Sequence, residues 1–135
     1  MKRFLAVLLT FLLLTVSAWG LTWNTANQMT VAWDASATAD IPQEQITYTV
    51  YMIDSTDTAK DNPIMVAEGL IDTEYTFTFA TEGRYLLGVK AVRTVSGEKV
   101  SESVISWSDN EQYTTNTFGA VFYKAPNQPG GFGPK

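Results

Sequence analysis

The stretch YTFTF, residues 75–79, alternates aromatic side chains with threonines. Successive side chains of a β-strand point to opposite faces of a sheet, so this period of two predicts a strand with one buried, aromatic face. The same period runs through residues 46–52 and through residues 29–33. No helical period of 3.6 residues is sustained after residue 19,. We therefore expect an all-β domain.

A fourth alternating run covers residues 85–92, with an aromatic and aliphatic face on the odd-numbered positions. Polar segments at residues 34–42 and 54–63 separate these runs, and we expect turns at Gly69, Gly83 and Gly97 because glycine tolerates the positive φ that turns require,. Seven short antiparallel strands at this spacing are typical of an immunoglobulin-like β-sandwich. The three remaining candidate strands are residues 21–24, 64–67 and 101–107.

Several positions carry a family resemblance. Trp33 ends one predicted strand, Tyr48 and Val50 lie in the next, and Tyr85 opens a run that continues with Val89, Ala91 and Val92 and is followed by Gly97. Residues 21–109 thereby resemble the fibronectin type III family. The resemblance implies a seven-stranded antiparallel β-sandwich in which Trp33 packs in the core and Tyr85 forms a tyrosine corner. It implies no activity, and the chain lacks both the Arg-Gly-Asp of integrin-binding members and the family's usual lead into the tyrosine.

Composition excludes several function classes. The 135 residues contain no cysteine and no histidine, which removes disulfides, thiolate and imidazole metal sites and Ser-His or Cys-His nucleophiles,. The formal charge of −5 is the wrong sign for a nucleic-acid binder, which needs a basic face,. We expect no cofactor and no nucleic-acid partner.

The first eighteen residues read as a secretory signal peptide. A basic start at Lys2 and Arg3 precedes an apolar run at residues 4–16, and small residues follow at the spacing that signal peptidase requires,. We predict cleavage after Ala18, with Gly20 as the competing site and an uncleaved membrane anchor as the alternative. Processing leaves seven basic and fourteen acidic residues, a formal charge of −7. The mature protein is then periplasmic, at the cell surface or extracellular, with no membrane span.

Acidic residues offer weak candidate sites. Asp54, Asp57 and Asp61 share one loop, but their spacing matches neither of two known calcium-loop patterns, so we expect a solvated loop and no metal,. Paired carboxylates for glycoside hydrolysis are available in two places, but a small sandwich seldom offers the cleft that such chemistry needs. These pairs are Glu68 with Glu74 and Glu98 with Glu102. We expect no catalytic activity.

Aromatic residues suggest a second function. Trp23 and Trp107 lie near the ends of predicted strands, where they could form an exposed platform for sugar rings or cap the core,. A glycan ligand therefore stays open as an alternative.

The chain continues beyond the domain predicted for residues 19–110. The extension, residues 111–135, contains an apolar, strand-like segment at residues 117–123 and a flexible Pro/Gly-rich tail at residues 124–135,. An uncharged apolar strand should not stay exposed. It either joins its own sheet, adds to the sheet edge of a partner, or forms a sticky disordered patch. Partner contacts are predicted for Phe118, Val121, Phe122 and Tyr123.

These features predict a non-catalytic, exported fibronectin type III protein that acts in protein–protein interaction or as a structural module of the cell surface. The expected partner is another exported or cell-surface protein. The alternative is a carbohydrate-binding β-sandwich that uses exposed aromatic side chains.

Overall fold

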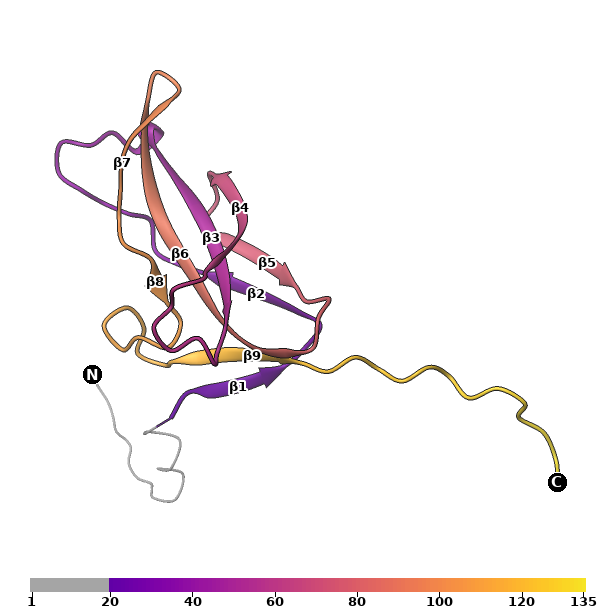
Figure 1. Ribbon diagram of the computed structural model, residues 1–135. Helices are drawn as coiled ribbons and strands as arrows, with labels where there is room; N and C mark the ends of the chain where they lie inside the picture. Colours follow the sequence, from indigo (N-terminus) through magenta and orange to yellow (C-terminus); the bar gives the residue numbers. More distant parts are fainter. Residues whose placement is uncertain (1–19) are drawn as a thin grey trace, which may run out of the picture.

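A computed structural model describes residues 20–135 of the chain. It is an all-β structure in which two sheets form a sandwich-like arrangement (Figure 1). The predicted signal peptide and its cleavage point after Ala18 lie outside the described residues. The strands are β1 (Thr22–Thr25), β2 (Gln28–Ala32), β3 (Ile46–Asp54), β4 (Ile64–Leu70), β5 (Glu74–Thr78), β6 (Gly83–Val95), β7 (Glu98–Glu102), β8 (Ser106–Trp107) and β9 (Phe118–Phe122), with one short 3-10 helix, η2 (Gln43–Gln45).

The larger sheet has seven strands in the order β1-β9-β6-β3-β4, with β7 and β8 also paired with β6. The smaller sheet is the β2-β5 pair. All pairings are antiparallel except that of β1 with β9, which is parallel. The prediction of seven strands in a purely antiparallel arrangement is therefore wrong in detail: residues 20–135 form nine strands, and the larger sheet is mixed.

β6 is the central strand of the larger sheet. Its 13 residues pair with β3 on one side and successively with β7, β8 and β9 on the other. The β6–β7 hairpin turns through Ser96 and Gly97, whose φ values of 54° and 82° are both positive. Positive φ at both positions is the geometry of a two-residue type I′ hairpin loop, so the turn predicted at Gly97 is confirmed.

Gly69 has a different role from the one predicted. It lies inside β4 with a φ of 70°, where the register against β3 shifts between Tyr48 and Val50. An extra residue in one strand of a pair produces a β-bulge, and glycine is suited to its left-handed position. The predicted turn at Gly69 is thus a bulge, and β4 continues to Leu70.

The main core lies between the two sheets. Its fully enclosed members are Val50, Phe77, Phe79, Tyr85, Leu87 and Ala120. Val50 of β3, Phe77 of β5 and Tyr85 and Leu87 of β6 lie on the faces that the alternation predicts. Phe79 directly follows β5, and Ala120 comes from β9. Tyr85 stacks on Phe79 and donates its hydroxyl hydrogen to the carbonyl oxygen of Thr81, 2.5 Å away.

A second apolar cluster covers the opposite face of the larger sheet. Tyr51, Ile53, Leu86 and Trp107 are buried there, with Trp23 packed against them. Close packing requires glycine on this face. A Cβ at Gly88 would lie 2.8 Å from Trp107 Cε3, and a Cβ at Gly119 would overlap the Trp23 ring.

The chain beyond the predicted domain end at residue 110 belongs to the same sheet. β9 pairs with β6 through Tyr85 and Ala120, and with β1 through Trp23 and Gly119. The apolar segment at residues 117–123 therefore joins its own sheet. Beyond β9, the tail projects away from the two sheets (Figure 1).

Candidate functional site

A cleft of about 520 Å³ opens along one side of the sandwich. One wall is formed by the end of β2 and the segment that follows it, residues 31–36. The other wall is formed by residues 103–108, which include β8, and by the loop between β8 and β9. The cleft lies where the two sheets are not bridged by a further strand.

The floor of the cleft is apolar. Val50, Phe77 and Leu87 are buried core residues that also line the cleft, and Val31 and Phe118 are partly buried beside them. A concave site with an apolar lining is typical of ligand-binding pockets. The cleft is therefore the opening through which a ligand would reach the core.

The outer edge of β2 carries unpaired backbone groups. Trp33 N–H donates to Thr73 at 2.9 Å and Phe79 N–H donates to Asn27 at 3.0 Å, so the odd-numbered residues of β2 are those bonded to β5. In an antiparallel pair the intervening residues direct their N–H and C=O groups away from the partner strand. Thr30 and Ala32 therefore present their backbone groups outward, and no strand of residues 20–135 pairs with them.

Trp33 supplies an unsatisfied donor beside this edge. Its indole Nε1 is buried and has no hydrogen-bond acceptor among the described residues. A buried donor without a partner costs about 1–3 kcal/mol. Since Trp33 lines the cleft, an acceptor brought in by a ligand would remove this cost.

Serine hydroxyls maintain the wall opposite β2. Between β7 and β8, and again after β8, the backbone ladder on β6 is interrupted. Ser108 Oγ accepts the Leu87 N–H at 3.1 Å, and Ser103 Oγ accepts the Ala91 N–H at 3.0 Å. The same serines donate their own N–H groups to the carbonyls of Leu87 and Ala91 at 2.8 and 2.9 Å. β6 thus keeps its hydrogen bonds although its neighbouring strand is broken.

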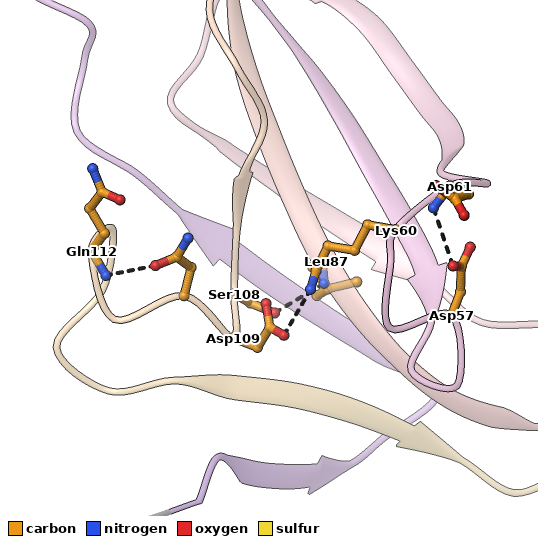
Figure 2. A network of polar contacts seen from close by, with 8 residues as sticks. Asp57, Lys60, Asp61, Leu87, Ser108, Asp109 and Gln112 are labelled. Atoms are coloured by element: carbon orange, nitrogen blue, oxygen red, sulfur yellow. Dashed lines mark hydrogen bonds and ion pairs between the residues drawn. The ribbon is translucent and has the colours of Figure 1, made fainter.

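The loop between β8 and β9 is fixed at its base. Figure 2 shows the ion pair between Lys60 Nζ and Asp109 Oδ2, 3.1 Å apart, which joins this loop to the β3–β4 loop. Within the loop, Asn110 Oδ1 accepts the backbone N–H of Gln112 at 2.9 Å. Tyr113, which lines the cleft, is held by a hydrogen bond from its N–H to the Asn110 carbonyl. The rim of the cleft is therefore an ordered loop.

The four predicted partner-contact residues are not brought together on one surface. Val121 is only 4% exposed, Phe118 and Phe122 are partly buried against the core, and Tyr123 is 61% exposed. Because β9 pairs on one side with β6 and on the other with β1, it has no free edge for a partner strand. Val121 alternates with the core residue Ala120, so its buried side chain points to the outer face of the larger sheet, as Gly119 does,. Contact of a partner with these four residues stays a prediction.

The tryptophan platform is also not formed. Trp107 is 9% exposed and lies in the cluster on the outer face of the larger sheet. Trp23 packs over Gly119, and the Arg84 guanidinium lies 5.2 Å from the centre of its ring. Trp107 is therefore buried, and the ring of Trp23 contacts Gly119 and Arg84.

Asp54 and Asp57 accept hydrogen bonds from within the β3–β4 loop. Asp54 Oδ1 accepts hydrogen bonds from both the hydroxyl and the N–H of Thr56, which lower the pKa of Asp54. Asp57 accepts the N–H groups of Asp61 and Asn62, and hydrogen bonding at the Asp61 amide is the largest cause that lowers the pKa of Asp57 (Figure 2). Within residues 20–135 no group of three acidic side chains is placed to hold a metal ion.

The carboxylate pairs do not flank the cleft. Glu68 and Glu74 lie on strands of different sheets, and neither Glu98 nor Glu102 lines the cleft. Glu102 instead forms ion pairs with Lys90 at 2.9 Å and Lys99 at 3.0 Å, which lower the pKa of its carboxyl group. These residues line a polar groove of about 460 Å³ on the outer face of the larger sheet. Since Glu102 already pairs with both lysines, these charges are less available to a ligand, and we consider the apolar cleft the better candidate site.

Comparison of the chain with models of known families, with curated proteins and with solved structures gives no match. In the part of the chain that the structure describes, no helix has the length and apolar character to cross a membrane. The geometry of the cleft is therefore the basis for the functional assignment.

Proposed function

We propose that this chain is an exported, non-catalytic interaction module that binds an extended strand of another protein in the cleft beside β2. The observation that carries the proposal is the unpaired outer edge of β2 next to an apolar floor. In strand addition, main-chain hydrogen bonds along a free edge give affinity, and pockets for alternate side chains give specificity. The outward backbone groups of Thr30 and Ala32 supply the main-chain hydrogen bonds, and the apolar floor supplies the surface that receives side chains.

The proposal includes an immunoglobulin-like fold of the fibronectin type III kind. In that assignment β2 and β5 are strands B and E, β3 and β6 are strands C and F, and β7 to β9 form a broken strand G. The hydrogen bond from Tyr85 to Thr81 supports it, because a tyrosine that bonds a few residues upstream near the start of strand F is a hallmark of such sandwiches,. Immunoglobulin-like domains place strand A beside strand B. Among residues 20–135 no strand takes that position, so the cleft is the place of a missing strand.

Export is supported by the sequence alone. The basic start, apolar run and small residues before Trp19 have the order of a signal peptide,. We place the mature protein in the periplasm, at the cell surface or outside the cell, and its partner among exported or cell-surface proteins. A glycan ligand has less support, because Trp107 is buried and Trp23 packs against Gly119 and Arg84.

The test is selection of extended peptides from a display library on the processed protein, followed by NMR mapping. We expect selected peptides that carry a large apolar residue in an extended segment to shift the amides of Thr30 and Ala32 and the indole N–H of Trp33. Thr30→Pro removes one outward N–H, which an edge strand tolerates, and should weaken binding at least fivefold. Thr30→Val keeps the N–H and is the matched control. Peptides that bind on another face, or equally well to Thr30→Pro, would contradict the proposal.

A further inference from the structure

We infer that the strand that occupies the cleft is the C-terminal tail, residues 124–135, of a second copy of this chain. This inference rests on the proposed function and names its partner. It is carried by the freedom of the tail, its charge and its single large apolar side chain.

Beyond Lys124, the tail makes no polar contact with the rest of its own described chain. Lys124 N–H donates to Glu82 Oε2 at 2.8 Å, and no hydrogen bond or ion pair joins residues 125–135 to the rest of the described chain. Every residue from Tyr123 onward is exposed. The tail is therefore available to another molecule.

The tail and the body have opposite charge. Residues 19–123 contain five basic and fourteen acidic side chains, a formal charge of −9. The tail contains Lys124 and Lys135 and no acidic side chain. Two charged residues line the cleft: Asp34, which can meet such a lysine, and Lys90, whose charge is already paired with Glu102 at 2.9 Å. Attraction of opposite charges steers association and weakens as salt is added.

Phe132 supplies an apolar group of the kind that the cleft floor accepts. Its side chain is fully exposed in the single chain, which is unfavourable for an aromatic residue,. Glycines flank it on both sides, so its backbone can come close to a neighbouring strand without side chains in the way,. The backbone carbonyls around it also provide acceptors for the indole N–H of Trp33.

The tail of one molecule is directed away from its own cleft. It leaves β9 at the end that pairs with Gly83, and the bond from Lys124 to Glu82 holds its first residue at the β5–β6 connection. In Figure 1 the tail runs outward on the side opposite β8, which forms part of the cleft wall. An extended chain advances about 3.3 Å per residue, so Phe132 can lie about 30 Å from β9. The tail thus reaches a neighbouring molecule.

A contact between the tail of one copy and the cleft of the next joins two different surfaces. Such a heterologous contact closes into a ring or continues as an open chain of molecules. The processed protein should therefore form a series of species as its concentration rises, and this series should shorten in high salt.

The test is sedimentation equilibrium of the processed full chain over a hundredfold range of concentration, with Phe132→Ser and with Tyr123→Ser as an exposed aromatic control. We expect the average mass to rise with concentration, Phe132→Ser to weaken association at least tenfold, and Tyr123→Ser to match the unmodified chain. A synthetic peptide of residues 124–135 should dissociate the assembly and shift the indole N–H signal of Trp33.

Two results would overturn the inference. One is a chain that stays monomeric at every concentration, and the other is association that Phe132→Ser leaves unchanged. In either case, library peptides that still bind at Thr30 and Ala32 would keep the proposed function and remove only the tail as its partner. If no peptide binds there, the proposed function fails as well.

Discussion

Trp33 meets Tyr48 edge to face, with ring centroids 5.5 Å apart and ring planes at 61°. The Tyr48 hydroxyl accepts a hydrogen bond from the Ser36 N–H at 2.8 Å. Together these contacts tie the end of β2 and the segment after it to β3 in the opposite sheet. They hold the wall of the cleft in place while the outer edge of β2 stays open.

Two substitutions of Trp33 distinguish the stability that comes from packing of its ring from the cost of its unpaired indole N–H. Trp33→Ala removes a partly buried aromatic ring and should lower the free energy of unfolding by about 3 kcal/mol. Trp33→Phe keeps an aromatic ring but removes the unpaired N–H, so its free energy of unfolding should change by less than about 1 kcal/mol. Urea denaturation measures both. Equal losses in the two variants would show that the indole N–H does have a partner.

Ser108→Ala tests the hydroxyl that bridges the break after β8. The variant leaves the buried N–H of Leu87 without its acceptor, which should cost about 1–3 kcal/mol,. Ser106→Ala, two residues earlier on β8, removes a hydroxyl with no hydrogen bond to the described chain and serves as the control. Denaturant midpoints compare the two. If both variants lose the same stability, the Ser108 bond has no special role.

Gly88→Ala tests the packing of the outer face. The added Cβ would lie 2.6 Å from Ile105 Cγ2 and 2.8 Å from Trp107 Cε3, so both side chains must move. Overpacking of this kind costs about 1–3 kcal/mol. Gly130→Ala in the tail, where a Cβ meets no atom within 4 Å, should leave thermal unfolding unchanged. A neutral Gly88→Ala would mean that Trp107 is not seated against β6.

The ion pair of Glu102 with Lys90 predicts the pH dependence of stability. Hydrogen bonds from Lys90 and Lys99 lower the pKa of Glu102, so its contribution is present above the unfolded glutamate pKa of about 4.3 and is lost as pH falls through the lower folded value,. Hydrogen bonding with Tyr51, and then with Glu102, raises the pKa of Lys90, whose contribution is lost as pH rises through that higher value.

The measurement for this pair is the urea midpoint as a function of pH for the unmodified chain and Glu102→Gln. The two should differ at neutral pH and converge as the medium is acidified. Glu98→Gln on the same strand, which removes no ion pair of the described chain, is the control. A difference that persists at pH 2 would contradict the assigned pair.

Local alternation was sufficient to predict the paired elements of the sandwich. The period of two at residues 75–79 and 46–52 corresponds to β5 and β3, and its phase correctly placed Phe77 and Val50 inside. This succeeds because alternation reports burial on one face of a sheet directly. The sequence predicts a turn at Gly69 where the structure has a bulge, since a glycine with positive φ fits either geometry and only the pairing partner decides between them.

The cleft could not be predicted in this way. Its existence depends on which strand lies beside β2, a long-range choice that no local pattern encodes. The break in the strand beside β6 was hidden for a similar reason: Ser103 and Ser108 look like ordinary polar residues until their hydroxyls are seen to replace backbone acceptors. The burial of Trp107 likewise depends on Gly88, nineteen positions earlier in the chain.

The most direct test of the open edge is amide hydrogen exchange of β2 in dilute, monomeric protein. Thr30 and Ala32 should exchange rapidly because their N–H groups face outward, whereas Val31 should be protected by its pairing with Tyr75,. Added peptide of residues 124–135 should then slow exchange at Thr30 and Ala32. Protection of these two amides equal to that of Val31 in the dilute protein would show that the edge is already covered, and the account of the cleft as a strand-binding site would be wrong.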